Sequence, residues 1–264
     1  MCQMTEIEQS IKDKLHKIEE EENIEIFYAC ETGSRAWGFE SEDSDFDVRF
    51  LYLHPRNWYL TIENKKDVIE RPINNNLDIS GWDIRKTLIL FRKSNPPLLE
   101  WLQSSIVYKK SFTITDQIRR LMPEYYSPRS CLYHYLHMAQ GNYRHYLKGG
   151  EVWVKKYFYV LRPILACKWI EEDRGIVPME FNKLVDGVAK DPILKSEIAL
   201  LVERKKSGKE LDRGPKIPVI SDFIERELDR LTMDNNARPA IRSDIEVLDE
   251  LFRNALVEVW GNST

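Results

Sequence analysis

The first half of the chain shows both helical and strand-like hydrophobic patterns. Isoleucine and leucine recur at helical spacing among Glu and Lys over residues 4–22, which predicts an amphipathic helix. Residues 24–30 are rich in Ile, Phe and Tyr and predict a buried strand. Residues 45–53 alternate apolar and polar side chains, which predicts a half-buried strand with Asp45 and Asp47 on one face.

Two more strands and a helix are expected before the pattern changes. Residues 66–70 predict a short strand, and residues 77–80 predict a stronger one that runs into Gly81-Trp82. Asp83 then has the position of an N-cap for a helix that Asn95-Pro96-Pro97 ends.

From Pro97 onward the pattern is overwhelmingly helical. Ser127-Pro128 is a typical helix start, and Gly149-Gly150 breaks the helix that follows. Residues 152–170 are apolar nearly all round, which predicts a central buried helix. Further helices are expected at residues 181–188, 192–203, 221–231 and 241–260, with a polar loop over 205–218.

These elements predict an α+β protein in two parts. Residues 1–112 are expected to form a mixed sheet with helices, and residues 113–264 an all-helical domain. The cleft between the two parts is the expected binding site.

Composition and charge exclude several classes of protein. With 264 residues, 42% hydrophobic and 31% charged, the chain can bury a core and is neither disordered nor fibrous. The net charge of −4 means that a nucleic acid would have to meet a local basic patch. The cysteines form no Cys-x-x-Cys pair, which argues against a zinc ribbon or a disulfide framework and favours a cytoplasmic location. Apolar runs fall short of the roughly 18 residues of a membrane span, so no membrane partner is expected.

The densest candidate chemistry lies in residues 33–49, Gly-Ser-Arg-Ala-Trp-Gly-Phe-Glu-Ser-Glu-Asp-Ser-Asp-Phe-Asp-Val-Arg. Gly33 lets the backbone approach a phosphate closely, and Ser34 adds a hydroxyl donor. Asp45 and Asp47, two apart on one strand, can hold a hard divalent cation such as Mg²⁺.

A third carboxylate on the neighbouring strand would allow two metal ions. Asp78 is the best candidate. Asp83 competes with it, but Gly81-Trp82 separates Asp83 from the strand and places it at the start of a helix. Asp43 is an open alternative whose simpler role is to solvate a loop.

The second half contributes basic residues near a predicted helix face. Lys155, Tyr159 and Arg162 fall at i, i+4 and i+7, where the cations could bind a triphosphate or an acceptor backbone while the tyrosine stacks on a base. Lys156 could join them or simply lie on a solvated face. Two arginines of the first half could do similar work, Arg35 and Arg49. Three tryptophans could bind a base but more often such residues pack in the core: Trp37, Trp82 and Trp101.

The motif resembles a known superfamily. Gly-Ser, ten further residues, Asp-Phe-Asp on a strand and a later strand Asp are similar to the nucleotidyltransferase superfamily of DNA polymerase beta. The whole of residues 33–49 resembles, more narrowly, the bacterial RNA-repair-associated (RlaP-type) nucleotidyltransferases. The similarity extends through residues 78–86, 95–102 and 155–163.

The resemblance implies transfer of a nucleotidyl group from a nucleoside triphosphate to an acceptor hydroxyl, by in-line displacement at the α-phosphorus. It places Gly33 and Ser34 on the triphosphate. It also places three carboxylates on two Mg²⁺ ions, or on Mn²⁺ in their place: Asp45, Asp47 and Asp78. The implied acceptor is an RNA end. Two other hypotheses stay open: adenylylation of a protein side chain or a small molecule such as an aminoglycoside, and a non-catalytic nucleotide- or RNA-binding module.

Overall fold

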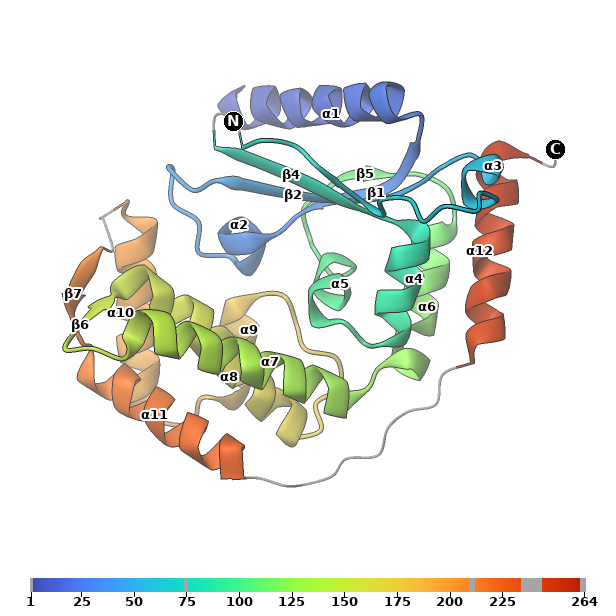
Figure 1. The fold of residues 1–264 in the computed structure, drawn as a ribbon. Helices are drawn as coiled ribbons and strands as arrows, with labels where there is room; N and C mark the ends of the chain where they lie inside the picture. The colour runs from blue at the N-terminus through green and yellow to red at the C-terminus, as the bar shows by residue number, and fades with distance from the viewer. Residues whose placement is uncertain (1, 74–75, 209–211, 234–243, 262–264) are drawn as a thin grey trace.

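A five-stranded mixed sheet forms the first half of the molecule (Figure 1). The structure is a computed structural model that describes residues 2–73, 76–208, 212–233 and 244–261. The sheet has the order β3-β4-β2-β1-β5, in which β2 and β4 are parallel and the other neighbours are antiparallel. Its strands are β1 (Glu25–Glu31), β2 (Phe46–Leu53), β3 (Val68–Glu70), β4 (Leu77–Asp83) and β5 (Val107–Lys110). The predicted α+β class and four of the five strands are confirmed, whereas β5 lies where a helical pattern was expected.

Helices cover both faces of this sheet. The N-terminal helix α1 (Cys2–Glu22) lies across one face, where Ile11 and Leu15 share a buried cluster with Val48 and Phe50 of β2. Three helices of this half begin after strands or turns: α2 (Gly33–Trp37), α3 (Arg56–Tyr59) and α4 (Ile84–Arg92). Leu51 of β2, on the other face, is also fully buried, in the larger core. The prediction that β2 is half-buried is therefore wrong, because side chains of both its faces enter a core.

The second half is mainly helical, as predicted. Its helices, with the short α5 that precedes them, are α5 (Pro96–Trp101), α6 (Ile114–Tyr125), α7 (Pro128–Asn142), α8 (Tyr157–Glu171), α9 (Phe181–Val188), α10 (Pro192–Lys206), α11 (Pro218–Met233) and α12 (Ile245–Trp260). A π-helical turn (Tyr143–Leu147) ends α7. Residues 241–243 of the predicted last helix lie outside the described residues.

The central helix begins later than the hydrophobic pattern predicted. Instead of a helix from residue 152, the structure has β6 (Glu151–Trp153) and a 3₁₀ turn (Val154–Lys156) before α8. Strand β6 pairs with β7 (Arg213–Pro215), which lies in the expected polar loop. The apolar run therefore splits between a strand and a helix, because a distant segment supplies the strand's hydrogen bonds.

The two halves share one core. A single buried cluster extends from Phe27 in β1 to Leu256 in α12. Helix α12 packs against α4 of the first half as well as against α6 (Figure 1). The rings of Phe39 and Phe158 stack with centroids 4.3 Å apart, so the loop between α2 and β2 packs against α8. A boundary at residue 112 stays a prediction. Among the described residues, no helix is long and apolar enough to traverse a lipid bilayer.

Candidate active site

The end of β1 and the turn after it hold Asp47 in place. The backbone amide and hydroxyl of Thr32 both donate to the carbonyl oxygen of Asp47, at 2.8 and 2.9 Å. The amide of Asp47 donates to Oε1 of the buried Glu31 at 2.7 Å. Helix α2 begins at Gly33 with φ +60°, and a Cβ there would lie 2.0 Å from Oδ2 of Asp47. Glycine is therefore required at the point where the backbone meets this carboxylate.

Parallel pairing of β2 and β4 brings Asp78 beside Asp47. The two residues are direct partners in the register. One guanidinium nitrogen (Nη2) of Arg49 lies 2.7 Å from Oδ2 of Asp78 and 3.7 Å from Oδ1 of Asp47. Burial raises the pKa of Asp47; Arg49 opposes this, and the negative charges of Asp78 and Asp45 add to it. Arg49 thus balances a concentration of negative charge and does not line the pocket as a free cation.

Asp83 lies at the opposite end of β4 and has a structural role. It is 1% exposed and is the N-cap of α4, accepting from the amide of Arg85 at 2.7 Å. The hydroxyl of Tyr59 also donates to it, at 2.7 Å. Burial raises the pKa of Asp83 to about 6. Of the two candidates for a third carboxylate, only Asp78 is placed beside Asp47.

A small pocket brings residues of both halves together. It is lined by Ser34, Asp45 and Asp47 from the first half and by Lys155, Tyr159 and Lys205 from the second. Asp45 is exposed and lies one residue before β2. Five of the predicted site residues therefore meet around one hollow, with a lysine that was not predicted.

The carboxylates fit a divalent cation only in part as they stand. Asp45 and Asp47 offer the hard oxygen donors that Mg²⁺ prefers. In the part of the chain that the structure describes, no three carboxylate, imidazole or thiol groups form a ready-made metal site. The carboxylate of Asp78 accepts from the guanidinium of Arg49 at 2.7 Å and is not among the residues that line the pocket.

Arg162 is the clearest departure from the predicted site. It is 2% exposed, and its Nη1 donates to Oε1 of Glu100 at 2.7 Å. Its Nη2 donates to the carbonyls of Pro178 and Met179, both at 3.2 Å. The expectation that Arg162 binds the triphosphate is therefore corrected. Lys155 lies in the 3₁₀ turn, outside α8, so the helical spacing that placed the two cations on one face does not apply.

Three other candidate residues do not line the pocket but contact residues that do. Arg35 donates to the carbonyls of Ser44 and Asp45, at 2.7 and 3.2 Å, and its guanidinium lies 3.7 Å from the ring centre of Phe46. It therefore shapes the loop that carries Asp45. The ammonium of Lys156 lies over the ring of Tyr159, 4.4 Å from its centre. Trp37 packs edge-on against Tyr159, which agrees with the packing role expected for it.

Two contributors to the site were missed by sequence reasoning. Lys205, near the end of α10, donates to the hydroxyls of Ser41 at 2.9 Å and Ser44 at 3.4 Å. Glu31 accepts from the amide of Asp47 and from the hydroxyl of Tyr108. No local pattern marks either residue, because each acts on a partner brought close only by the fold.

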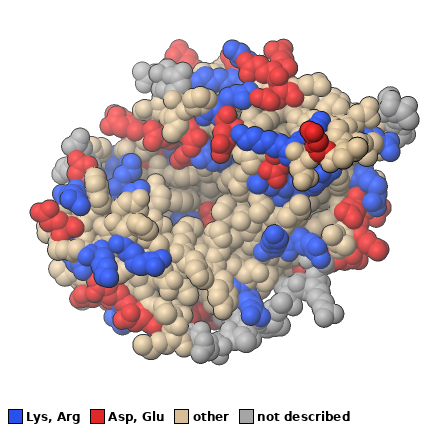
Figure 2. Space-filling view, in the orientation of Figure 1, with Lys and Arg blue, Asp and Glu red and all other residues tan. Residues whose placement is uncertain are grey.

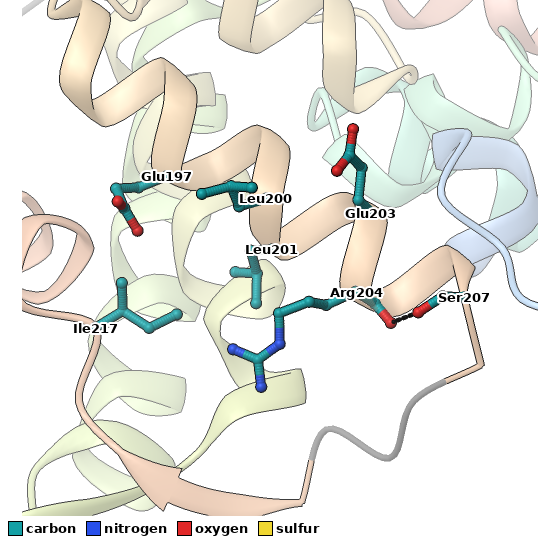
Figure 3. A pocket seen from close by; sticks show the side chains of 7 residues that line it. All are labelled: Glu197, Leu200, Leu201, Glu203, Arg204, Ser207 and Ile217. Atoms are coloured by element: carbon teal, nitrogen blue, oxygen red, sulfur yellow. Dashed lines mark hydrogen bonds between the residues drawn. The ribbon is translucent and has the colours of Figure 1, made fainter.

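A larger depression lies elsewhere, between α10 and the residue before α11 (Figure 3). Its volume is about 420 Å³, and its lining consists of Glu197, Leu200, Leu201, Glu203, Arg204, Ser207 and Ile217. The carboxylates of Glu197 and Glu203 do not point toward one another in Figure 3. The smaller pocket is the better candidate, because only there do carboxylates, lysines and a hydroxyl converge.

Comparison with known proteins assigns the family. A sequence model of the RNA repair pathway DNA polymerase beta family (RlaP) matches residues 7–254. The chain belongs to this family. It is 51% identical over 255 residues to a Bacillus subtilis (strain 168) protein, the uncharacterized protein YcgL, covering 96% of this chain and 98% of that one.

A nucleotidyltransferase-like protein from Exiguobacterium sibiricum 255-15 aligns over 94% of this chain and 89% of its own, with 14% identity and a TM-score of 0.31. That likeness is too low to carry an argument. Membership of the polymerase beta family makes this protein a nucleotidyltransferase, an enzyme that transfers nucleotidyl groups.

Proposed function

We propose that this enzyme transfers a nucleoside monophosphate from a nucleoside triphosphate to the hydroxyl of an RNA end, in a Mg²⁺-dependent reaction. The observation that carries the proposal is the pairing of Asp47 with Asp78 across parallel strands, next to a pocket shared by Asp45, Ser34 and Lys155. Membership of an RNA repair family supports RNA as the acceptor.

In this reaction the acceptor oxygen forms a bond to the α-phosphorus, the bond to the bridging oxygen of pyrophosphate breaks, and the acceptor loses its proton. Ser34 and the amides of the turn at Gly33 bind the triphosphate, and Lys155 balances its charge from the opposite wall. Asp78 faces the acceptor side. Arg49 must release Asp78 first, because its guanidinium occupies that carboxylate.

Asp45, Asp47 and Asp78 would hold the divalent cation. A bound Mg²⁺ supplies charge stabilisation to the phosphates and lowers the pKa of an attacking hydroxyl. The buried, unpaired thiols of Cys30, Cys131 and Cys167 agree with a reducing, cytoplasmic location.

The test is incubation of the purified protein with each α-labelled nucleoside triphosphate, Mg²⁺ and total RNA. Asp47→Asn should lower the rate of label transfer to RNA at least 100-fold, because it removes a charged metal ligand without changing side-chain size. Asp222→Asn is the matched control. It removes the same charge from an exposed position of α11 that does not line the pocket, and should leave the rate within about threefold.

Label that enters RNA with the wild type and not with Asp47→Asn supports the proposal. Label on protein would favour adenylylation of a side chain instead. Equal transfer by Asp47→Asn and wild type would refute the metal assignment, and absence of transfer with every nucleotide would favour the non-catalytic binding module.

A further inference from the structure

Exposed aromatic rings and cations form a strip that leads away from the pocket. Tyr159 lines the pocket and is 37% exposed. The ammonium of Lys156 lies over both Tyr159 and Tyr146, at 4.4 and 4.8 Å from the ring centres. Tyr146 belongs to the π-helical turn that ends α7, and β6 packs directly against this turn.

The two-stranded antiparallel sheet of β6 and β7 continues the strip. Trp153 and Arg213 are direct partners across the two strands, and both are exposed, while Val152 between the exposed positions of β6 is buried. The guanidinium of Arg213 lies 5.4 Å from the ring centre of Trp153. Trp153 is 41% exposed, which leaves part of its ring accessible to a stacking partner.

Two cations of this strip, and Lys155 beside it, have no salt-bridge partner among the described residues. Among the described residues, no carboxylate oxygen lies within 4.0 Å of the charged groups of Lys155, Lys156 or Arg213. Lys168 and Lys216, in the same half, pair with Glu227 and Glu225 at 3.4 and 2.8 Å. Figure 2 shows Lys and Arg side chains over the end of α7, near strands β6 and β7 (Figure 1). The strip thus combines cations that pair with no described carboxylate and two rings that are partly exposed, those of Trp153 and Tyr159.

We propose that this strip, defined by Trp153, Arg213, Tyr146, Lys156 and Tyr159, binds the unpaired strand of the acceptor RNA and leads its end to the pocket. Stacking on aromatic faces together with cations that follow the backbone is how proteins hold single strands without reading their sequence. A base stacks on Trp153, Arg213 contacts the phosphates, and the strand continues along Lys156 to Tyr159. This inference rests on the proposed function for the identity of the acceptor.

The experiment measures binding of a fluorescently labelled, unstructured 12-nucleotide RNA by anisotropy, without nucleotide or Mg²⁺. Trp153→Ala should weaken binding about 10-fold or more, the effect of losing one stacked base. Arg213→Ala should reduce the slope of log affinity against log salt concentration by about 0.7, the value for one phosphate contact on a single strand. Trp153→Ala should leave that slope unchanged.

The matched control is Tyr133→Ala, which removes an exposed aromatic ring of α7 that is 57% accessible and lies roughly 14 Å along the helix from its end. It should bind RNA within twofold of the wild type. Equal binding by Trp153→Ala and wild type, equal loss in Tyr133→Ala, or no RNA binding by the wild type would each overturn the inference.

The two experiments distinguish failure of the strip proposal from failure of the proposed function. RNA affinity that depends on Trp153 in a protein without transferase activity would support the strip and refute the proposed function. Transfer that depends on Asp47, with RNA affinity independent of Trp153, would refute the strip alone.

Discussion

Replacing Gly33 by alanine tests whether the position of Asp47 controls catalysis. Gly33 has φ +60°, and an added Cβ would lie 2.0 Å from Oδ2 and 2.9 Å from Cγ of Asp47. The left-handed backbone alone costs an alanine about 1–2 kcal/mol. The collision adds to this cost, and the Asp47 carboxylate must leave its position to relieve it. The backbone of Asp47 cannot follow, because Thr32 and Glu31 hold its carbonyl and amide.

Gly38→Ala is the matched control for this substitution. Gly38 ends α2 with φ +88°, so an alanine there has a similar backbone cost, but nothing lies within 4 Å of its Cβ. Urea unfolding should therefore show a loss of about 1–3 kcal/mol for Gly33→Ala and about 1–2 kcal/mol for Gly38→Ala.

The transfer assay should separate the two variants. Gly33→Ala should lose at least 100-fold in kcat/KM, about 2.7 kcal/mol of transition-state stabilisation, while Gly38→Ala stays within about threefold of the wild type. Equal activity of the two folded variants would refute the reasoning, because the close approach of Gly33 to Asp47 would then have no catalytic consequence.

Three further predictions concern stability, pH dependence and the second wall of the pocket. Glu100→Gln leaves the buried guanidinium of Arg162 without its carboxylate and should lower the free energy of unfolding by about 3–5 kcal/mol. Its control is Glu171→Gln, which breaks a more exposed pair with Arg230 and should cost under about 1 kcal/mol. Similar losses for the two variants in urea unfolding would contradict this prediction. Burial raises the pKa of Asp83 to about 6, so the folded state retains a proton that the unfolded state releases near pH 4. The free energy of unfolding should therefore fall by up to about 3 kcal/mol as the pH rises from 4 to 6. Asp83→Asn should remove that part of the pH dependence in urea unfolding, and an unchanged slope would show that other groups cause it. Lys205→Met should lower kcat/KM for the nucleotide about 10-fold, because Lys205 donates to Ser41 and Ser44 and adds positive charge to the pocket. Substitution of its exposed neighbour, Lys206→Met, should leave kcat/KM unchanged. Equal effects of the two variants in steady-state kinetics would exclude this role for Lys205.

Short-range patterns determined most of the first half of this protein. The helical spacing of α1, the strand at β2 and the cap at Asp83 depend on neighbours within a few residues, so the sequence predicts these elements directly. The burial of both faces of β2 depends on distant partners, and the sequence did not predict it. The spacing from Gly33 and Ser34 to Asp45 and Asp47 is also local, because a short turn and one strand contain it. The family followed from the same residues, and the comparison confirmed it.

Distant contacts decided the remainder. The pairing of β6 with β7 goes with a later start of α8, which leaves Lys155 outside the helix. Independently, packing of α8 against α5 places Arg162 on Glu100 in the core. Parallel pairing of β2 with β4 placed Asp78 beside Asp47 and brought Arg49 between them. Lys205 donates to Ser44, which lies 161 residues away in the sequence. Hydrophobic periodicity reports which side of an element is buried, and not which element buries it, so partners far apart in the chain are defined only when the tertiary structure packs them together.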